Sequence, residues 1–254
     1  MKLSVVLATY NEENNLARCL NSVKNIADEI IVVDGESSDK TVNIAKQFGA
    51  KVIKTTNKPM FHTNKQMAIN AATKDWILQL DADEVVDKQL KKSIEKIITK
   101  DDQHSAFYLK RKNFFLGRLL TKGGQYPDSV IRFFKKGKAR LPQKSVHEQM
   151  KVTGSIGTLN GHLLHFTAPT FSRYLTNANR YTSLTAQELK QKHLPINLIN
   201  TFNFIIIKPL TMFISLYIRH KGFIDGFPGF VFALFSGLHH PIAYMKYWEL
   251  NRRQ

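Results

Sequence analysis

The sequence contains a single cysteine, and this scarcity excludes several classes of protein. One thiol cannot form a disulfide framework or a zinc site built on cysteine ligands. Cys19 lies near Leu16 and Leu20 at helical spacing, so we expect an inert thiol in the core. The first residues, MKLSVVLATYNEE, have too short an apolar run for a signal peptide. We therefore expect a protein that stays in the reducing cytoplasm.

Acidic residues are also few, because 20 Asp and Glu stand against 37 Lys and Arg, a net charge of +17. Such an excess predicts an anionic partner: nucleic acid, an acidic membrane or a phosphorylated substrate. The chain has no helix-turn-helix, zinc or RNP-type motif, and acids cluster at one predicted site. We therefore expect no nucleic acid among its partners, and a non-enzymatic nucleic-acid-binding protein is kept only as the alternative from another class.

Long uninterrupted apolar runs are missing as well, although the chain turns apolar after Pro195. Lys208-Pro209 interrupts the first apolar stretch, and Asp225 and Pro228 break up the second. Neither stretch gives the roughly 18 to 20 apolar residues of a usual spanning helix. Short aromatic-rich helices flanked by cations favour an amphipathic anchor at a membrane surface; the cations are Arg219, Lys221, Lys246, Arg252 and Arg253. A packed helical subdomain, a homo-oligomer interface and a true span are the alternatives.

Strands and helices alternate through the first hundred residues. Strands are expected at 3–8, 30–33, 51–54 and 76–80, with helical patterns between them. This rhythm predicts an α/β fold with a mainly parallel sheet and helices on both faces. After residue 100 the pattern changes to strands near 107–112 and 130–134, and then to a helix over 170–192. No internal repeat or low-complexity linker separates these parts.

Asp81, Ala82 and Asp83 are the most informative residues of the chain. The apolar run Trp76–Leu80 reads as a strand buried on both faces, and it ends directly at these acids. Ligands of an open α/β sheet bind at the carboxyl ends of its strands. Carboxylate oxygens suit Mg²⁺ or Mn²⁺, which commonly bridge a protein acid to substrate phosphates. A solvated acidic turn is the alternative reading of the same three residues.

Three segments stand in a fixed order: SVVLATYNEENNLARCLNSV, IIVVDGESSDKTVNIAKQFGA and DWILQLDADE. Together they resemble the family 2 glycosyltransferases, whose GT-A fold is a Rossmann-like, nucleotide-sugar-binding mixed sheet flanked by helices. The later segments PDSVIRFFKKGKARLPQKSVHEQM and RHKGFIDGFPGFVFAL are similar to bacterial enzymes that glycosylate the inner core of lipopolysaccharide. The resemblance covers essentially the whole chain. It implies a donor half at 1–100, an acceptor half at 101–194 and a C-terminal helical extension at 195–254.

The resemblance assigns the donor nucleotide to the first two strand ends. Asp34 matches the acid that binds uracil, and the backbone of Thr9 and Tyr10 with Glu12 matches the segment that holds base and ribose. Many relatives have proline where this chain has Thr9, which matters little if backbone atoms make the contact. Lys65 stands where relatives place a basic residue that reaches the ribose or diphosphate, with Gln66 in place of the usual asparagine. A solvated surface lysine is the alternative reading of Lys65.

The resemblance also implies a metal site and a base. Asp83 matches the acid that binds Mg²⁺ or Mn²⁺ directly, Asp81 the one that contacts ribose or a metal-bound water, and Ala82 lies between them. By the same resemblance His165 is a further metal ligand, with a structural histidine as the alternative. Arg132 contacts donor phosphate or an anionic acceptor, with a salt-bridged strand arginine as the alternative. Glu148 matches the base that takes the proton from the acceptor hydroxyl, and His147 beside it orients the loop or contacts diphosphate.

These roles imply an inverting, metal-dependent transfer of a hexose from a nucleotide-diphosphate sugar, expected to be UDP-linked. The implied acceptor is an anionic lipopolysaccharide or lipooligosaccharide core, and a polyprenyl-phosphate or protein acceptor is the alternative with the same chemistry. We expect the protein to be cytoplasmic and peripheral on the inner face of the bacterial inner membrane.

Overall fold

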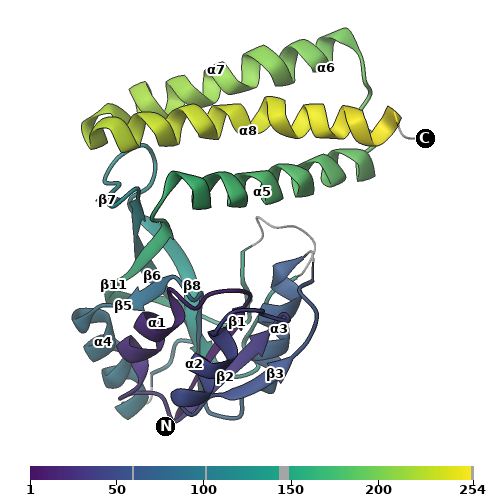
Figure 1. Ribbon diagram of the computed structural model, residues 1–254. Coiled ribbons are helices and arrows are strands. Elements are labelled where there is room, and N and C mark those ends of the chain that lie inside the picture. Colours follow the sequence, from purple (N-terminus) through teal and green to yellow (C-terminus); the bar gives the residue numbers. More distant parts are fainter. Residues whose placement is uncertain (59, 101, 143–148, 253–254) are drawn as a thin grey trace. The chain divides into compact units, whose positions relative to one another are not determined.

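The computed structural model describes residues 1–58, 60–100, 102–142 and 149–252 (Figure 1). The chain forms two compact units. Unit 1 comprises residues 1–111 and 128–165, and unit 2 comprises residues 112–127 and 166–254. Each is described here by itself.

Four parallel strands form the first part of the sheet in unit 1. They lie in the order β3-β2-β1-β4 and are β1 (Leu3–Thr9), β2 (Glu29–Asp34), β3 (Lys51–Lys54) and β4 (Trp76–Leu80). The helices between them are α1 (Leu16–Val23), α2 (Thr41–Gln47) and α3 (Phe61–Ala71). Strands β1 and β4 are buried on both faces, which explains their continuous apolar runs.

The two faces of this sheet have separate cores. Leu3, Val5 and Leu7 pack with Leu16 and Leu20 of α1 on one face. Val6 of β1 and its neighbour Ile31 of β2 point to the other face, where they pack with Ala68 and Ile69 of α3. Because side chains alternate along a strand, each strand serves both cores.

Antiparallel strands complete the sheet, in the order β4-β8-β6-β11-β5. They are β5 (Glu84–Val86), β6 (Ala106–Phe115), β8 (Asp128–Lys135) and β11 (Ile156–Ala168), with α4 (Lys88–Thr99) after β5. The short β7 (Arg118–Leu119) pairs with the end of β6, and β9 (Ala139–Arg140) pairs with β10 (Lys151–Val152). The predicted mixed sheet flanked by helices is therefore confirmed.

Unit 2 is mainly helical. It contains α5 (Phe171–Gln191), α6 (Leu198–Phe202), the π-helix η1 (Asn203–Ile207), α7 (Lys208–Phe213), the π-helix η2 (Ile214–Arg219), the 3₁₀-helix η3 (Gly222–Asp225) and α8 (Gly226–Arg252). Helix α8 contacts both α5 and α7 and lies between them in Figure 1. A long C-terminal helical extension was predicted, and the structure has one.

The expectation that neither apolar stretch has the length of a spanning helix is wrong for the first stretch. Residues 198–219 run as one helix of 22 residues, and among the described residues this is the helix long and apolar enough to cross a membrane. Proline is tolerated because Pro209 follows the π-helix η1 and lies in the first turn of α7. A π turn already departs from the regular hydrogen-bond ladder, so the missing proline N–H costs less there.

Candidate active site

The carboxyl ends of β1, β2 and β4 meet at one edge of the sheet in unit 1. Thr9 lies opposite Asp34 in the pairing of β1 with β2, and Leu7 lies opposite Leu80 in the pairing of β1 with β4. Asp81 therefore leaves the sheet next to the end of β1. Parallel pairing of these strands brings together side chains that are far apart in the sequence.

Asp34 is almost fully buried and firmly held. Its Oδ1 accepts hydrogen bonds from Thr9 Oγ1 at 3.2 Å and Ser37 Oγ at 2.6 Å, and its Oδ2 accepts the Ser37 N–H at 2.9 Å. The Gly35 N–H donates to the Thr9 carbonyl at 2.9 Å. Thr9 therefore contributes its side chain as well as its backbone, which was not predicted.

The segment after β1 turns back over β2. Asn11 has a φ of 53°, and its N–H donates to Ser37 Oγ at 2.9 Å. The Glu12 N–H donates to Thr41 Oγ1 at 2.8 Å, and the Glu12 carboxylate accepts from Asn15 Nδ2 at 2.8 Å. Tyr10 is exposed. The structure therefore places the predicted base and ribose residues along one turn beside Asp34.

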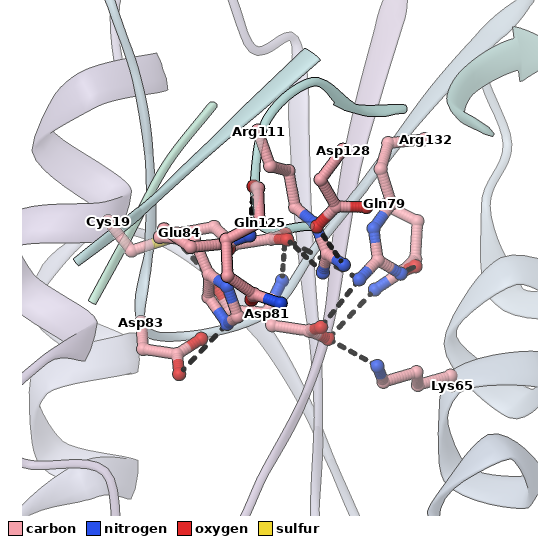
Figure 2. A network of polar contacts seen from close by, with 12 residues as sticks. Cys19, Lys65, Gln79, Asp81, Asp83, Glu84, Arg111, Gln125, Asp128 and Arg132 are labelled. Carbon is pink, nitrogen blue, oxygen red and sulfur yellow. Dashed lines mark hydrogen bonds and ion pairs between the residues drawn. The ribbon is translucent and has the colours of Figure 1, made fainter. Parts of the chain in front are cut away.

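Asp81 is the centre of a network of largely buried charges (Figure 2). Its Oδ1 lies 2.5 Å from Lys65 Nζ of α3, and its Oδ2 lies 2.6 Å from Arg132 Nη2 of β8. Gln79 Nε2 donates to Asp81 Oδ1 at 3.3 Å, and Arg132 Nη1 donates to Gln79 Oε1. Three of the predicted residues, Lys65, Asp81 and Arg132, are thus brought into direct contact.

The opposite charges of Asp81 and Arg132 stabilise each other's ionised forms. Burial opposes the ionised form of Asp81, but Arg132 and Lys65 outweigh it and hold the pKa of that carboxyl far below its usual value. The pKa of Arg132 is raised, because Asp81 and Glu84 outweigh its burial. The pKa of Lys65 is lowered, mainly by burial.

Asp83 points to a different partner. Its Oδ2 lies 3.5 Å from His165 Nε2, because His165 of β11 pairs in register with Glu84 of β5. Burial raises the pKa of Asp83, yet the His165 hydrogen bond outweighs it and the net shift is downward. Burial likewise lowers the pKa of His165, and its bond to Asp83 reverses that effect and raises it. Within the described part of the chain, no three His, Cys, Asp or Glu side chains converge as a metal cage.

Several members of the network were not predicted. Glu84 is fully buried, its Oε2 accepts the Asp81 N–H at 2.9 Å, and its Oε1 lies 3.4 Å from Arg132 Nη2 and 3.6 Å from Arg111 Nη1. Arg111 Nη2 in turn lies 2.7 Å from Asp128 Oδ2. The position of Glu84 directly after Asp81-Ala82-Asp83 was a usable signal. Arg111 and Asp128 had none, because their contact follows from the register of β6 with β8.

Two predicted residues, His147 and Glu148, fall in 143–148, outside the described residues.

Cys19 is a buried thiol whose pKa is raised by burial, as expected of an inert core cysteine.

Comparison with known families gives a match over residues 4–153 to the model described as "Glycosyl transferase family 2". An uncharacterized glycosyltransferase of Rickettsia typhi is 31% identical over 264 residues, covering 98% of this chain and 88% of that protein. The lipopolysaccharide core biosynthesis glycosyltransferase LpsC of Rhizobium meliloti is 28% identical over 251 residues, covering 93% of this chain and 90% of that protein.

Solved structures resemble this fold at low sequence identity. The mannosyltransferase PcManGT of Pyrobaculum calidifontis, in complex with GDP-Man and Mn²⁺, has a TM-score of 0.56 at 11% identity, covering 97% of this chain and 87% of that one. S. aureus TarS 1–349 in complex with UDP has a TM-score of 0.50 at 15% identity, covering 100% of this chain and 92% of that one. These likenesses confirm the predicted GT-A fold.

Proposed function

The chain belongs to glycosyl transferase family 2 and is a glycosyltransferase, and we propose that it moves a hexose from a UDP-sugar to a lipopolysaccharide core with inversion at the anomeric carbon. The observation that carries the donor assignment is the buried Asp34 beside the charged network of Asp81, both at the carboxyl edge of the parallel strands. The UDP in the TarS complex supports a uridine donor.

Asp34 is suited to read the base. A carboxylate has about four acceptor positions, and three are used by Thr9 and Ser37. A uracil N3–H would take the remaining one. Because the three existing bonds fix the carboxylate, it needs no reorganisation when the base binds.

The diphosphate needs more positive charge than the protein supplies. The network and the neighbouring Asp83 place three permanent cations against four carboxylates; these are Lys65, Arg111 and Arg132, and Asp81, Asp83, Glu84 and Asp128. A donor diphosphate would add further negative charge to this balance. Asp81 is already neutralised by Lys65 and Arg132, so these cations are shared rather than free for the diphosphate.

The residues fit a divalent metal. Asp83 and His165 offer a carboxylate oxygen and an imidazole nitrogen 3.5 Å apart, and such ions are commonly held by one or two protein ligands plus substrate phosphates. When bound, Mg²⁺ or Mn²⁺ supplies Lewis-acid stabilisation of the departing diphosphate. His165 must lose its proton to ligate, so metal binding should release a proton. Asp83 is the ligand proposed to be direct, and Asp81 contacts ribose or a metal-bound water.

The acceptor side is assigned from the resemblance and the LpsC relative. Glu148 acts as the base that takes the proton of the attacking hydroxyl, and His147 orients its loop. Residues 1–100 form the donor half and 101–194 the acceptor half. A polyprenyl-phosphate or protein acceptor is the second candidate, with the same donor chemistry. Contact with a membrane is proposed for residues 195–254, which belong to unit 2.

Thermal unfolding with nucleotide-sugars tests the donor and the metal together. A bound donor stabilises the native state, so one UDP-sugar with Mn²⁺ should raise the melting temperature while GDP-sugars do not. Asp83→Ala should abolish the part of this shift that requires Mn²⁺. Asp75→Ala, at the opposite end of β4, is the matched control and should keep it.

Two results would contradict the proposal. If no UDP-sugar raised the melting temperature of the wild type, the uridine donor would be refuted. A full Mn²⁺-dependent shift in Asp83→Ala would move the metal away from Asp83.

A further inference from the structure

A straight row of exposed apolar side chains runs along the helix of residues 198–219 in unit 2. Its members follow one another at intervals of four residues and are all exposed: Leu198, Phe202, Ile206, Leu210, Ile214 and Ile218. We call these six residues the apolar row. Leu198 is 88% exposed and Ile218 is 58% exposed, so the row is open from one end to the other.

The π turns explain why the row is straight. In a regular α-helix with 3.6 residues per turn, side chains four residues apart rotate about 40° around the axis at each step. A π turn contains more residues, so the same four-residue step falls short of a full turn and rotates the opposite way, and alternating α and π turns cancel these rotations. Helices η1 and η2 together supply half of the 22-residue helix. The unusual helix geometry therefore aligns the six residues of the apolar row, while Ile199 and Ile207 are exposed next to it.

The opposite face packs against α8. Phe204 stacks on Tyr244 with ring centroids 5.1 Å apart, and Thr201 Oγ1 lies 3.0 Å from Tyr244 Oη. A Cβ added to Gly237 would lie 2.7 Å from the Pro209 carbonyl oxygen, so the two helices approach closely. The helix is thus one-sided, with α8 on one side and solvent on the other (Figure 1).

Charge decides which partner suits this face. Unit 2 carries 13 Lys and Arg against three acids, Glu188, Asp225 and Glu249. Asp225 is buried and accepts the N–H groups of Thr121 and Lys122, so it adds little negative charge to the surface. A second copy would bring two strongly positive units together. An anionic lipid surface would instead be attracted, at about 1 kcal/mol for each cation close to it.

We propose that the helix 198–219 binds in the interface of an anionic lipid bilayer, parallel to the surface, with the apolar row inserted among the acyl chains. One-sided apolar helices of this kind bind in the interface plane. A transmembrane orientation would place Lys208, whose Nζ lies 3.3 Å from the Phe204 ring centroid, near the bilayer centre, where a cation is costly. Vesicle binding needs no sugar donor, so this inference stands or falls separately from the proposed function.

Single-cysteine labelling of the full chain tests the orientation. The natural Cys19 is buried, so a cysteine introduced at the surface can be labelled selectively. We would place an environment-sensitive dye at Leu198, Leu210 or Ile218 and add vesicles of phosphatidylcholine with or without phosphatidylglycerol. All three labels should report an apolar environment at equal depth, on the anionic vesicles only. A label at Leu175, an exposed leucine of α5, should not respond.

Loss of binding provides the second measurement. Leu210→Gln with Ile214→Gln should weaken partitioning onto anionic vesicles at least about tenfold, because two apolar side chains no longer insert. Leu175→Gln is the matched control and should bind as the wild type does. A depth profile that is deepest at Leu210 and shallow at both ends would show a span instead. If the wild type did not bind vesicles but formed oligomers that Leu210→Gln disrupts, the apolar row would be covered by a second copy of the chain. Either result overturns the proposal.

Discussion

At the scale of single residues, the site is stabilised by charges that compensate one another inside the protein. Lys65 is buried and Arg132 and Asp81 are largely shielded from solvent, so each charge would be costly alone. Glu84 joins them by accepting the Asp81 N–H while it lies close to two guanidinium groups. It touches no predicted substrate position, so we regard it as a positioning residue for Arg132 and Asp81.

Substitution of Glu84 tests this role. Glu84→Gln keeps the shape but leaves Arg132 and Arg111 short of one buried negative charge, and the free energy of unfolding should fall by about 3 kcal/mol. Urea unfolding at neutral pH measures this difference. Glu95→Gln, an exposed glutamate of α4, should change stability by about 0.5 kcal/mol or less. A Glu84→Gln protein as stable as the wild type would mean that the two arginines are neutralised without it.

The sequence predicted the residues that end a strand, because such positions are visible as a change from apolar to polar. Asp34 and Asp81 are of this kind. It did not predict the contact of Arg111 with Asp128, since that contact depends on how β6 aligns with β8 and not on the residues alone. The assignments of Glu148 and His147 rest on the resemblance and stay predictions.

At the scale of helices and strands, the parallel sheet is tied together at both ends. At the amino end, the Glu29 carboxylate of β2 accepts from Ser4 Oγ of β1 at 2.5 Å, and from the N–H and Oγ1 of Thr73, before β4, at 2.9 and 3.0 Å. At the carboxyl end, Asp34 links β2 to Thr9 of β1. The alignment of strand ends that forms the site is therefore supported from the opposite edge.

This support should depend on pH. Burial alone would raise the pKa of Glu29, but the hydrogen bonds from Ser4 and Thr73 outweigh it, and the net shift is downward. A depressed carboxyl pKa contributes stability above the unfolded value of about 4.3 and loses it as the pH falls through the folded value. Glu29→Gln should cost about 1–2 kcal/mol at pH 7, and the difference from the wild type should shrink below about pH 4. Urea unfolding across this range measures it, and a difference independent of pH would contradict the role given to the ionised carboxylate.

The elements themselves were predicted unevenly. The four parallel strands were placed within a residue or so of their observed ends, because buried strands have a strong apolar signal. Short helices were expected after Pro195, and residues 198–219 instead run as one helix because π turns accommodate Pro209. Such turns depend on packing against α8, which the local sequence does not reveal.

At the scale of the whole molecule, positive charge is unevenly divided between the two units. Unit 2 has 13 Lys and Arg against three acids, whereas unit 1 has 24 against 17. The acids of unit 1 include those of the network around Asp81, where each lies within 4 Å of a cation. The net charge of +17 therefore has two different consequences: an exposed field on unit 2 and compensated charges at the site of unit 1.

Ionic strength should separate these two consequences. Exposed charges are screened over about 8 Å at 0.15 M salt and about 3 Å at 1 M, whereas buried pairs are screened much less. Raising the salt from about 0.05 M to about 0.5 M should therefore weaken partitioning onto anionic vesicles about tenfold or more. The affinity for the UDP-sugar should change by about threefold or less, because Asp34 and Lys65 are buried and Asp81 is paired with Lys65. Vesicle flotation and a donor titration on the same protein sample give both values. If vesicle binding were insensitive to salt, insertion of the apolar row alone would hold the protein at the bilayer, and the positive charge of unit 2 would serve another partner.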